Sequence, residues 1–180
     1  MCKQCELRPV YEFTNKRKLC KGCFIKYFQK KFLYIIRKFK MIRINDVVFY
    51  KKSNDFRSVV LGDLLNLLVN KGVIELSNIK NKANKIALTD TLDTESDKII
   101  NTIIKGDINK LKNSRVVNNN ILKPLYLFLD REVELYARLK GLKFSAKKTK
   151  KNKISLFIDD MEKNHPELKR AIVNSYLELC

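Results

Sequence analysis

Histidine is almost absent from this chain: His165 is the single one in 180 residues. It stands beside Pro166 between two apolar-periodic stretches, a position that favours a turn residue over a metal ligand or a catalytic base. A Ser/His/Asp or Cys/His arrangement cannot be assembled without it. No Walker-type phosphate loop occurs either. These absences argue against triad-type nucleophilic catalysis and against a Walker-type nucleotide site.

Long apolar runs are also missing. None approaches the roughly 18 residues of a membrane-spanning helix, and the N-terminus carries cysteines where a signal peptide would place its apolar segment. We therefore expect a cytoplasmic protein that does not bind a membrane. Hydrophobic residues make up 45% of the chain, enough for the core of one modest domain with a small appendage.

Acidic residues are scarce. The 38 Lys and Arg against 19 Asp and Glu give a net charge of +19, and residues 16–43 hold eleven Lys or Arg and no acid. Such a surplus favours a polyanionic partner, which is bound through phosphate neutralisation and counterion release. The competing interpretation of this run is a helix face that is merely solvated. Residues 147–153 hold a second group of lysines, for which the competing interpretation is a flexible linker. The candidate phosphate-binding residues are Lys26, Lys30, Lys31, Arg37, Lys38, Lys40, Lys147, Lys148, Lys150 and Lys151.

Cysteine is absent between Cys23 and Cys180, and the other four cysteines form two knuckles. Cys2 and Cys5 are separated by two residues, as are Cys20 and Cys23. This spacing is typical of a tetrahedral zinc site with four thiolates, which leaves no open position for substrate and is therefore structural. Four reduced thiols and an iron–sulfur cluster are the alternatives. Cys180, the terminal residue, has no predicted role.

Apolar periodicity predicts an α/β order of elements after the cysteines. An amphipathic basic helix from residue 24 is followed by a strand at 47–50, a loop at 51–58 and a helix from 59 that stops before Gly72. Strands are expected at 73–76 and 85–88, an extended edge segment at 121–128, and helices at 94–105, 130–140 and along the last thirty residues. The expected buried residues of the later helices are Ile99, Ile100, Ile103, Ile104, Val133, Tyr136, Ala137, Ile154, Phe157, Ile158, Met161, Leu168, Ile172, Tyr176 and Leu179.

Several stretches in the same order resemble the tRNA 2-thiolation proteins of the TtuA-type PP-loop family. They are the two knuckles with residues 36–42, then 85–96, 105–107, 123–125, 132–141 and 161–166. The resemblance implies a truncated PP-loop-like parallel sheet with flanking helices over residues 44–180, preceded by a zinc module and basic helix over residues 1–43. Catalytic members of that family adenylate the wobble uridine of tRNA at C2 and deliver sulfur to it.

The departures from the family pattern are also informative. Where catalytic members carry a Ser-Gly-Gly-Lys-Asp-Ser loop for the ATP phosphates, this chain has Ser53, Asn54, Asp55, Phe56, Arg57 and Ser58. Both glycines are lost, and Asp55 places a negative charge where phosphate would bind. Ser145 lies near the position of a family cysteine, and serine cannot replace a thiolate as a soft metal ligand. We therefore expect neither ATP nor an iron–sulfur cluster.

The first hypothesis is a non-catalytic subunit that pairs with a catalytic PP-loop thiolase homologue, as a heterodimer or heterotetramer, and helps to bind tRNA. The stretch between Gly72 and Lys85 is shorter than its family equivalent, and a trimmed sheet is expected to expose apolar edges that a partner covers. The alternatives are a stand-alone zinc-dependent nucleic-acid-binding protein and a minimal ATP-dependent tRNA sulfurtransferase.

Overall fold

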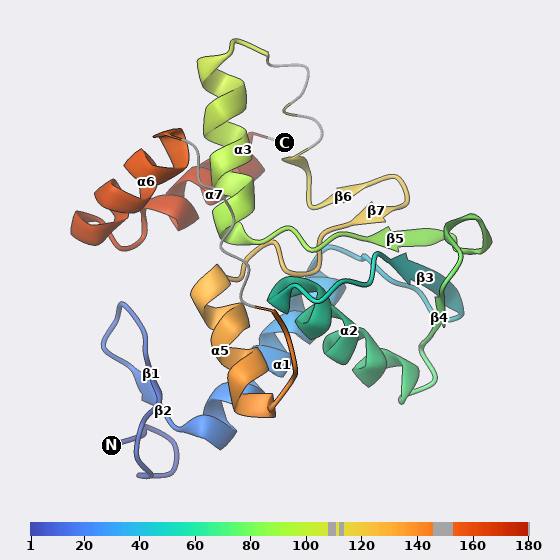
Figure 1. Cartoon of the computed structure of the whole chain (residues 1–180), viewed down its shortest axis with the longest axis horizontal. Helices are drawn as coiled ribbons and strands as arrows, with labels where there is room; N and C mark the ends of the chain where they lie inside the picture. The colour runs from blue at the N-terminus through green and yellow to red at the C-terminus, as the bar shows by residue number, and fades with distance from the viewer. Residues whose placement is uncertain (108–110, 112–113, 146–152, 180) are drawn as a thin grey trace.

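The computed structural model describes residues 1–107, 111, 114–145 and 153–179. Its centre is a five-stranded sheet in the order β4-β3-β5-β7-β6. The first four are parallel neighbours, and β6 pairs with β7 in the antiparallel sense at one edge. The predicted parallel α/β architecture is thus confirmed. A separate two-stranded hairpin lies near the N-terminus (Figure 1).

The strands of the main sheet are short, and three of them fall where apolar runs predict them. They are β3 (Asp46–Tyr50), β4 (Ile74–Ser77), β5 (Lys85–Ala87), β6 (Val117–Asn118) and β7 (Ile121–Leu122). β4 follows β3 in the chain and lies on one side of it, whereas β5 lies on the other side. The order in which successive strands are added to the sheet therefore reverses at β3, and the point of reversal lies between β3 and β5. In open parallel sheets, ligands bind in the crevice at the carboxyl ends of such strands.

Two groups of helices flank the sheet, as Figure 1 shows. The lower group in this view is α1 (Lys21–Lys38), α2 (Phe56–Val69) and α5 (Asp130–Lys140). The upper group is α3 (Leu92–Ile104), α6 (Lys153–Asn164) and α7 (Leu168–Glu178). A single 3-10 turn, η1 (Lys80–Lys82), separates β4 from β5. No helix in the described part of the chain is both long and apolar enough to cross a bilayer.

The aromatic stripe of α1 is buried, as its spacing predicts. Phe24, Phe28 and Phe32 are fully buried, together with Ile35 and Ile36. The Phe28 ring lies 4.3 Å from that of Phe128 and 4.4 Å from that of Tyr136, between centroids. Each of these rings contributes about 3–5 kcal/mol, the cost of truncating a buried Phe to Ala. The stripe belongs to the same cluster of buried hydrophobic residues as the sheet. The division into residues 1–43 and 44–180 stays a prediction.

The upper helices differ from the expected pattern of burial. Ile99, Ile158 and Tyr176 are buried as predicted, but five residues predicted to face inward are exposed. These five are Ile103, Ile104, Phe157, Met161 and Leu179. A charged centre lies between the helices. Lys169, which is 4% exposed, contacts Asp93 of α3 and both Asp159 and Glu162 of α6. On α6 the inward side is set by Asp159 and Glu162 together with Ile158, so Phe157 and Met161 turn outward. Ile103 and Ile104 lie in the last turn of α3, away from Asp93 in its first turn.

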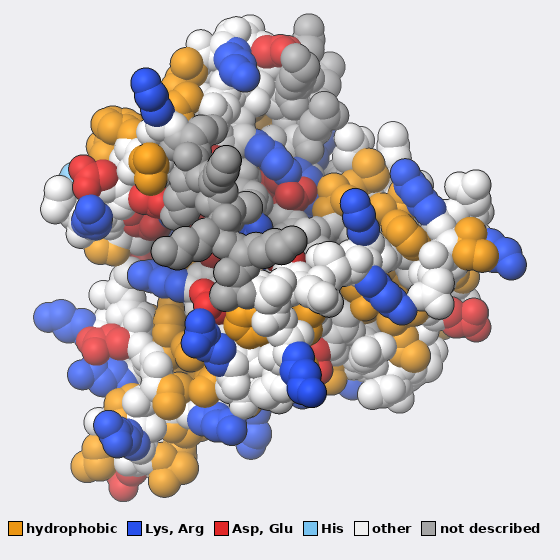
Figure 2. Space-filling model, viewed as in Figure 1, with side chains coloured by type: hydrophobic (Ala, Val, Ile, Leu, Met, Phe, Trp, Pro, Cys, Tyr) orange, Lys and Arg blue, Asp and Glu red, His pale blue; other side chains and the backbone are white. Residues whose placement is uncertain are grey.

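The edges of the sheet also differ from expectation. Within the described ranges, neither edge strand, β4 or β6, carries an exposed large apolar side chain. Exposed large apolar side chains are found on the upper helices, among them Ile103, Leu156 and Phe157, and Figure 2 shows orange patches there and on other parts of this face. Both edge strands are short, which limits edge-to-edge pairing in itself.

Candidate metal centre and nucleic-acid interface

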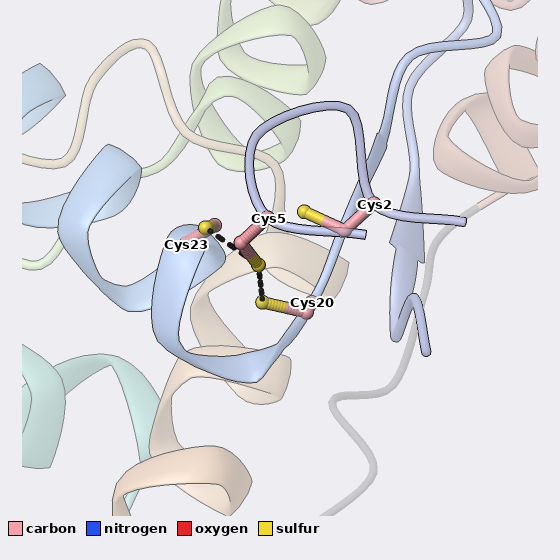
Figure 3. A group of neighbouring side chains, drawn as sticks. All are labelled: Cys2, Cys5, Cys20 and Cys23. Atoms are coloured by element: carbon pink, nitrogen blue, oxygen red, sulfur yellow. Dashed lines mark hydrogen bonds between the residues drawn. The ribbon is translucent and has the colours of Figure 1, made fainter. Parts of the chain in front are cut away.

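The four N-terminal cysteines converge on one point. Cys2 and Cys5 lie in the first loop, and the hairpin of β1 (Tyr11–Glu12) and β2 (Lys18–Leu19) brings the chain back to Cys20 and Cys23 at the start of α1. The Sγ atom of Cys5 lies 3.2 Å from that of Cys20 and 3.6 Å from that of Cys23. All four sulfurs lie within 4.8 Å of one another and point inward (Figure 3).

The backbone around these sulfurs favours thiolates at two positions. The Gln4 amide near Cys2 lowers the pKa of that thiol to about 6. The Cys23 amide does the same for Cys20, whose pKa is lowered. Conversely, hydrogen bonding with Cys5 and burial raise the pKa of Cys23 to about 12. Four thiolates this close together would repel one another, so the thiols do not all ionise by themselves. A bound cation favours the ionised form because its positive charge offsets that repulsion.

The sulfur spacing fits a single metal ion. Thiolates bound tetrahedrally at about 2.3 Å from zinc are roughly 3.8 Å apart, close to the distances between these sulfurs. In a cubane cluster each cysteine binds a different iron on the outside of the cluster, which requires wider spacing than four sulfurs on one ion. The four cysteines could therefore bind a metal, and Cys20 and Cys2, both nearly fully buried, would form its protected side.

The loop between β3 and α2 closes on itself. Asp55 is the N-cap of α2, and its side chain accepts a hydrogen bond from the Arg57 backbone N–H at 2.9 Å. A helix N-terminus is an anion-binding position because its first N–H groups lack partners within the helix. Here a carboxylate of the protein itself occupies that position. A phosphate group at the same place would meet the negative charge of Asp55.

Other contacts hold this loop in the same conformation. The Arg57 guanidinium forms an ion pair with Asp130 at the start of α5, and its Nε lies 2.7 Å from Oδ1. Ser58 Oγ donates to the Lys51 carbonyl and accepts from the Ser53 amide. The Asn54 carbonyl accepts from the Ser145 amide at 2.8 Å. The strand-to-helix turn is shorter than the predicted loop, because α2 begins at Phe56 and residues 56–58 form its first turn. The polar groups of residues 53–58 are directed at one another.

A cavity of about 770 Å³ lies beside this turn, at the point where the sheet changes direction. It is lined by the ends of β3 and β5, including Phe49 and Ala87, and by the loop residue Ser53. Lys51, Lys80 and Lys98 add positive charge, although Lys98 is engaged by Asp90 and Glu95. The position is that of a ligand site in an open parallel sheet. Its volume suits a small ligand.

Most of the predicted phosphate contacts on α1 are available to solvent. Lys26, Lys30, Arg37 and Lys38 are exposed on α1, and Lys40 is exposed just beyond its end. Lys31 differs, because its side chain is 14% exposed and its Nζ lies 3.2 Å from Glu132 Oε2. Lys31 is thereby an internal cation, and its place among the phosphate contacts is weakened. The other four, Lys147, Lys148, Lys150 and Lys151, lie outside the described residues.

Comparison with known proteins rests on the fold. No protein-family model matches the sequence, and no curated protein matches it. Among solved structures, the chain is similar to the U34-tRNA thiolase NcsA from Methanococcus maripaludis, described with its [4Fe-4S] cluster. The TM-score is 0.80 at 20% sequence identity, over 99% of this chain and 86% of that one. The chain has the fold of a tRNA thiolase.

The cofactor expected from the sequence differs from the one named for the similar structure. The thiolase is described with a [4Fe-4S] cluster, whereas the sequence of this chain predicts none. Four of the five cysteines here belong to the N-terminal group, and the fifth is the terminal Cys180. A cluster bound by four thiolates would therefore have to use the knuckles. Metal analysis separates the two possibilities directly.

One arrangement of residues escapes sequence analysis, although Lys26 and Lys30 within it are predicted phosphate contacts. A cavity of about 400 Å³ lies between the N-terminal loop and the polar side of α1, and Arg17, Tyr27 and Tyr34 line it with Lys26 and Lys30. The hairpin carries Arg17 across to α1, where its guanidinium lies 5.1 Å from the Tyr27 ring centroid. Only the folded hairpin brings these residues together. The signal in the sequence that could have indicated this cavity is the presence of Tyr27 and Tyr34 on the basic side of α1.

Proposed function

We propose that this chain is a non-catalytic subunit of a tRNA wobble-uridine 2-thiolation complex. It would pair with a catalytic PP-loop homologue, in a heterodimer or heterotetramer, and help to hold the tRNA. The observation that carries the proposal is the Asp55 carboxylate at the N-terminus of α2, in a chain with the thiolase fold. The fold is retained while the anion position of its first strand-to-helix turn is filled by an acid.

The argument against catalysis is electrostatic. An ATP-dependent enzyme of this fold needs backbone N–H groups and positive charge at the phosphates. Here the guanidinium nearest to the turn is that of Arg57, and it forms an ion pair with Asp130. Both side chains are largely buried, which favours the pair over separate solvation. Moving Arg57 to a phosphate would break this ion pair and leave the Asp130 carboxylate with the hydrogen bond from the Thr91 hydroxyl and no cation. The turn is thus stable without a nucleotide.

The metal in this proposal is a structural Zn²⁺ ion bound by Cys2, Cys5, Cys20 and Cys23. The support is the close spacing of the sulfurs and the absence of an open ligand position. The ion would fix the loop, the hairpin and the first turn of α1 as one unit, in the cytoplasm, where thiols stay reduced.

Binding of tRNA is supported by charge. The net charge is +19, and Lys and Arg side chains spread over the face shown in Figure 2, including the protruding N-terminal module. Exposed lysines that meet phosphates raise affinity and orient the RNA without reading its sequence. Reading of the wobble base would fall to the catalytic partner.

The test is affinity purification of the tagged chain from native extract, with metal analysis, RNA sequencing and mass spectrometry of the eluate. The expected result is a stoichiometric PP-loop protein, bound tRNA and one zinc per chain. ATP binding by the purified chain should show no saturation at micromolar concentrations. A chain that elutes alone, without a PP-loop protein, would overturn the subunit role and favour the stand-alone zinc-dependent nucleic-acid-binding protein.

The cavity beside β3 and β5 favours a second candidate, a minimal ATP-dependent tRNA sulfurtransferase. Its volume and its lysines would suit a nucleoside with part of its phosphates. Saturable binding of ATP, lost on blocking that cavity with Ala87→Phe, would establish this candidate in place of the first. Ile79→Ala, an exposed position outside the cavity lining, is the matched control.

A further inference from the structure

The cavity beside α1 has the composition of a nucleotide site. It measures about 400 Å³, and its lining combines the side chains of Arg17, Lys26 and Lys30 with two tyrosine rings and Gln4. Lys31 also contributes to the wall, but its charge is matched by Glu132. No acidic residue belongs to the lining. A ligand in this cavity would therefore meet unpaired positive charge and flat apolar surface together.

Tyr34 provides an open aromatic face. Its side chain is 54% exposed, on the opposite side of α1 from the buried phenylalanines. The Lys38 ammonium lies 6.0 Å from its ring centroid, at the outer limit of a cation–π contact. An isolated exposed aromatic residue needs no explanation. This ring, however, forms the wall of a cavity that contains three available cations.

Arg17 is held in place before any ligand binds. Its guanidinium lies 4.8 Å from the Phe13 ring centroid and 5.1 Å from that of Tyr27. Phe13 and Tyr27 themselves meet edge to face. The buried Nε of Arg17 has no hydrogen-bond partner in the described part of the chain. A buried donor without an acceptor is unfavourable, and because solvent does not reach this Nε, a ligand in the cavity would contact Arg17 through its other guanidinium N–H groups.

We propose that this cavity binds one unpaired nucleotide of RNA, with the base stacked on Tyr34 and the adjoining phosphate held by Arg17, Lys26 and Lys30. The inference rests on the proposed function, which supplies RNA as the ligand. What it adds is that an unpaired nucleotide is recognised, through its base and its phosphate. Single-stranded RNA is bound through stacking of its bases on aromatic rings and through cations along its backbone. An acidic peptide would use the cations but would gain nothing from the exposed ring. The combination favours RNA.

The test uses the full chain and a fluorescent single-stranded oligouridylate, with a duplex RNA of equal length as the comparison probe. Tyr34→Ala should weaken binding of the single strand by about 5- to 150-fold, the range of base–aromatic stacking, and leave duplex binding unchanged. Tyr34→Phe keeps the ring and should retain affinity. Ile79→Ala removes an apolar side chain of similar exposure elsewhere and is the matched control.

Salt titration separates stacking from charge. Tyr34→Ala should leave the dependence of affinity on salt unchanged, whereas Lys26→Gln with Lys30→Gln should reduce its slope. Equal losses with the single strand and the duplex, or equal losses in the Ala and Phe variants, would overturn the stacking site. So would displacement of the oligouridylate by polyglutamate with the same potency in wild type and Tyr34→Ala.

Failure of the inference and failure of the proposed function give different results. A wild-type chain that binds whole tRNA with a salt-dependent affinity, together with an unaffected Tyr34→Ala variant, contradicts the stacking site alone. A wild-type chain that binds neither tRNA nor the oligouridylate contradicts both. Thermal unfolding of each variant shows that the fold is kept, since Tyr34 lies outside the core.

Discussion

Lys31 and Glu132 form an ion pair between α1 and α5, with Lys31 Nζ 3.2 Å from Glu132 Oε2. Glu132 is 1% exposed. The same carboxylate accepts hydrogen bonds from the Leu129 amide and from the Tyr11 hydroxyl of the N-terminal hairpin. Burial lowers the pKa of Lys31, and Glu132 opposes that effect. One carboxylate thus connects the hairpin, the basic helix and the α/β body.

Glu132→Ala should therefore destabilise the whole chain. It leaves the Lys31 ammonium buried without a counter-ion, which costs about 3–5 kcal/mol and lowers the Tm by about 10 °C in a chain of this size. Glu134→Ala, on the same helix and paired with exposed Arg138, should cost less than about 1 kcal/mol. Calorimetry of both variants makes the comparison. Equal losses would contradict a central role for Glu132.

Removal of the metal should unfold the N-terminal module. Cys20→Ser, or a strong chelator, should abolish stoichiometric metal and remove stabilisation of the order of 10 kcal/mol from this segment. The checks are metal content and thiol titration before and after chelation. Cys180→Ser, at the end of the chain, should change neither. Iron and sulfide in place of zinc, with visible absorbance, would contradict the zinc assignment.

Asp55→Ala should have a small cost in stability and open an anion site. Loss of the N-cap costs about 1 kcal/mol, or roughly 2–4 °C in Tm. Inorganic pyrophosphate should then raise the Tm of the variant more than that of wild type, because the N-terminus of α2 is free of the carboxylate. Asp160→Ala, an exposed acid on α6, is the control. An equal response to pyrophosphate in wild type and Asp55→Ala would mean that Asp55 does not exclude anions.

The basic side of α1 should account for part of the salt dependence of tRNA binding. Replacing Lys26 and Lys30 with Gln should reduce the slope of log affinity against log salt by about 1.4–1.8, the contribution of two phosphate contacts. Lys71 and Lys105 are also exposed and lie away from α1, so their replacement by Gln is the matched control. Identical slopes for the two double variants would identify the lysines of α1 as merely solvated.

Asp97 should make stability depend on pH in a defined direction. Burial raises the pKa of Asp97 above its ordinary value of 3.8, so the folded state binds this proton more tightly than the unfolded chain. Its ionised form is therefore a cost that is present at neutral pH and relieved as pH falls through the raised pKa. Asp97→Asn, which can still accept from the Ser155 hydroxyl, should raise the Tm at pH 7, and the gain should shrink in acid. A pH-independent gain would contradict this assignment.

Local patterns were enough to predict the metal knuckles, the burial of α1 and the alternation of strands and helices. The spacing of Cys2, Cys5, Cys20 and Cys23 fixes their convergence once the hairpin folds. The stripe from Phe24 to Ile36 is one-sided because its positions recur every three or four residues. These features depend on short-range geometry, which a sequence contains directly.

Long-range pairing of charges could not be predicted in the same way. In the sequence, Lys169 and Glu95 resemble solvated residues, yet both are buried. Lys169 contacts carboxylates from two helices, and Glu95 pairs with Lys123. The contacts of Lys169 with Asp159 and Glu162 set the inward side of α6, so Phe157 turns outward against the apolar pattern. The cavity beside α1 was missed for a related reason, because Arg17 reaches it only after the hairpin has folded.

Helix α1 begins among the cysteines and ends in the core of the α/β body. Its 18 residues make a rod about 27 Å long at 1.5 Å per residue. Because the rod is packed along its buried face, the metal module and the sheet keep a constant separation and orientation. Under the proposed function, RNA bound beside the first turns of α1 would therefore be held at a fixed distance from the sheet.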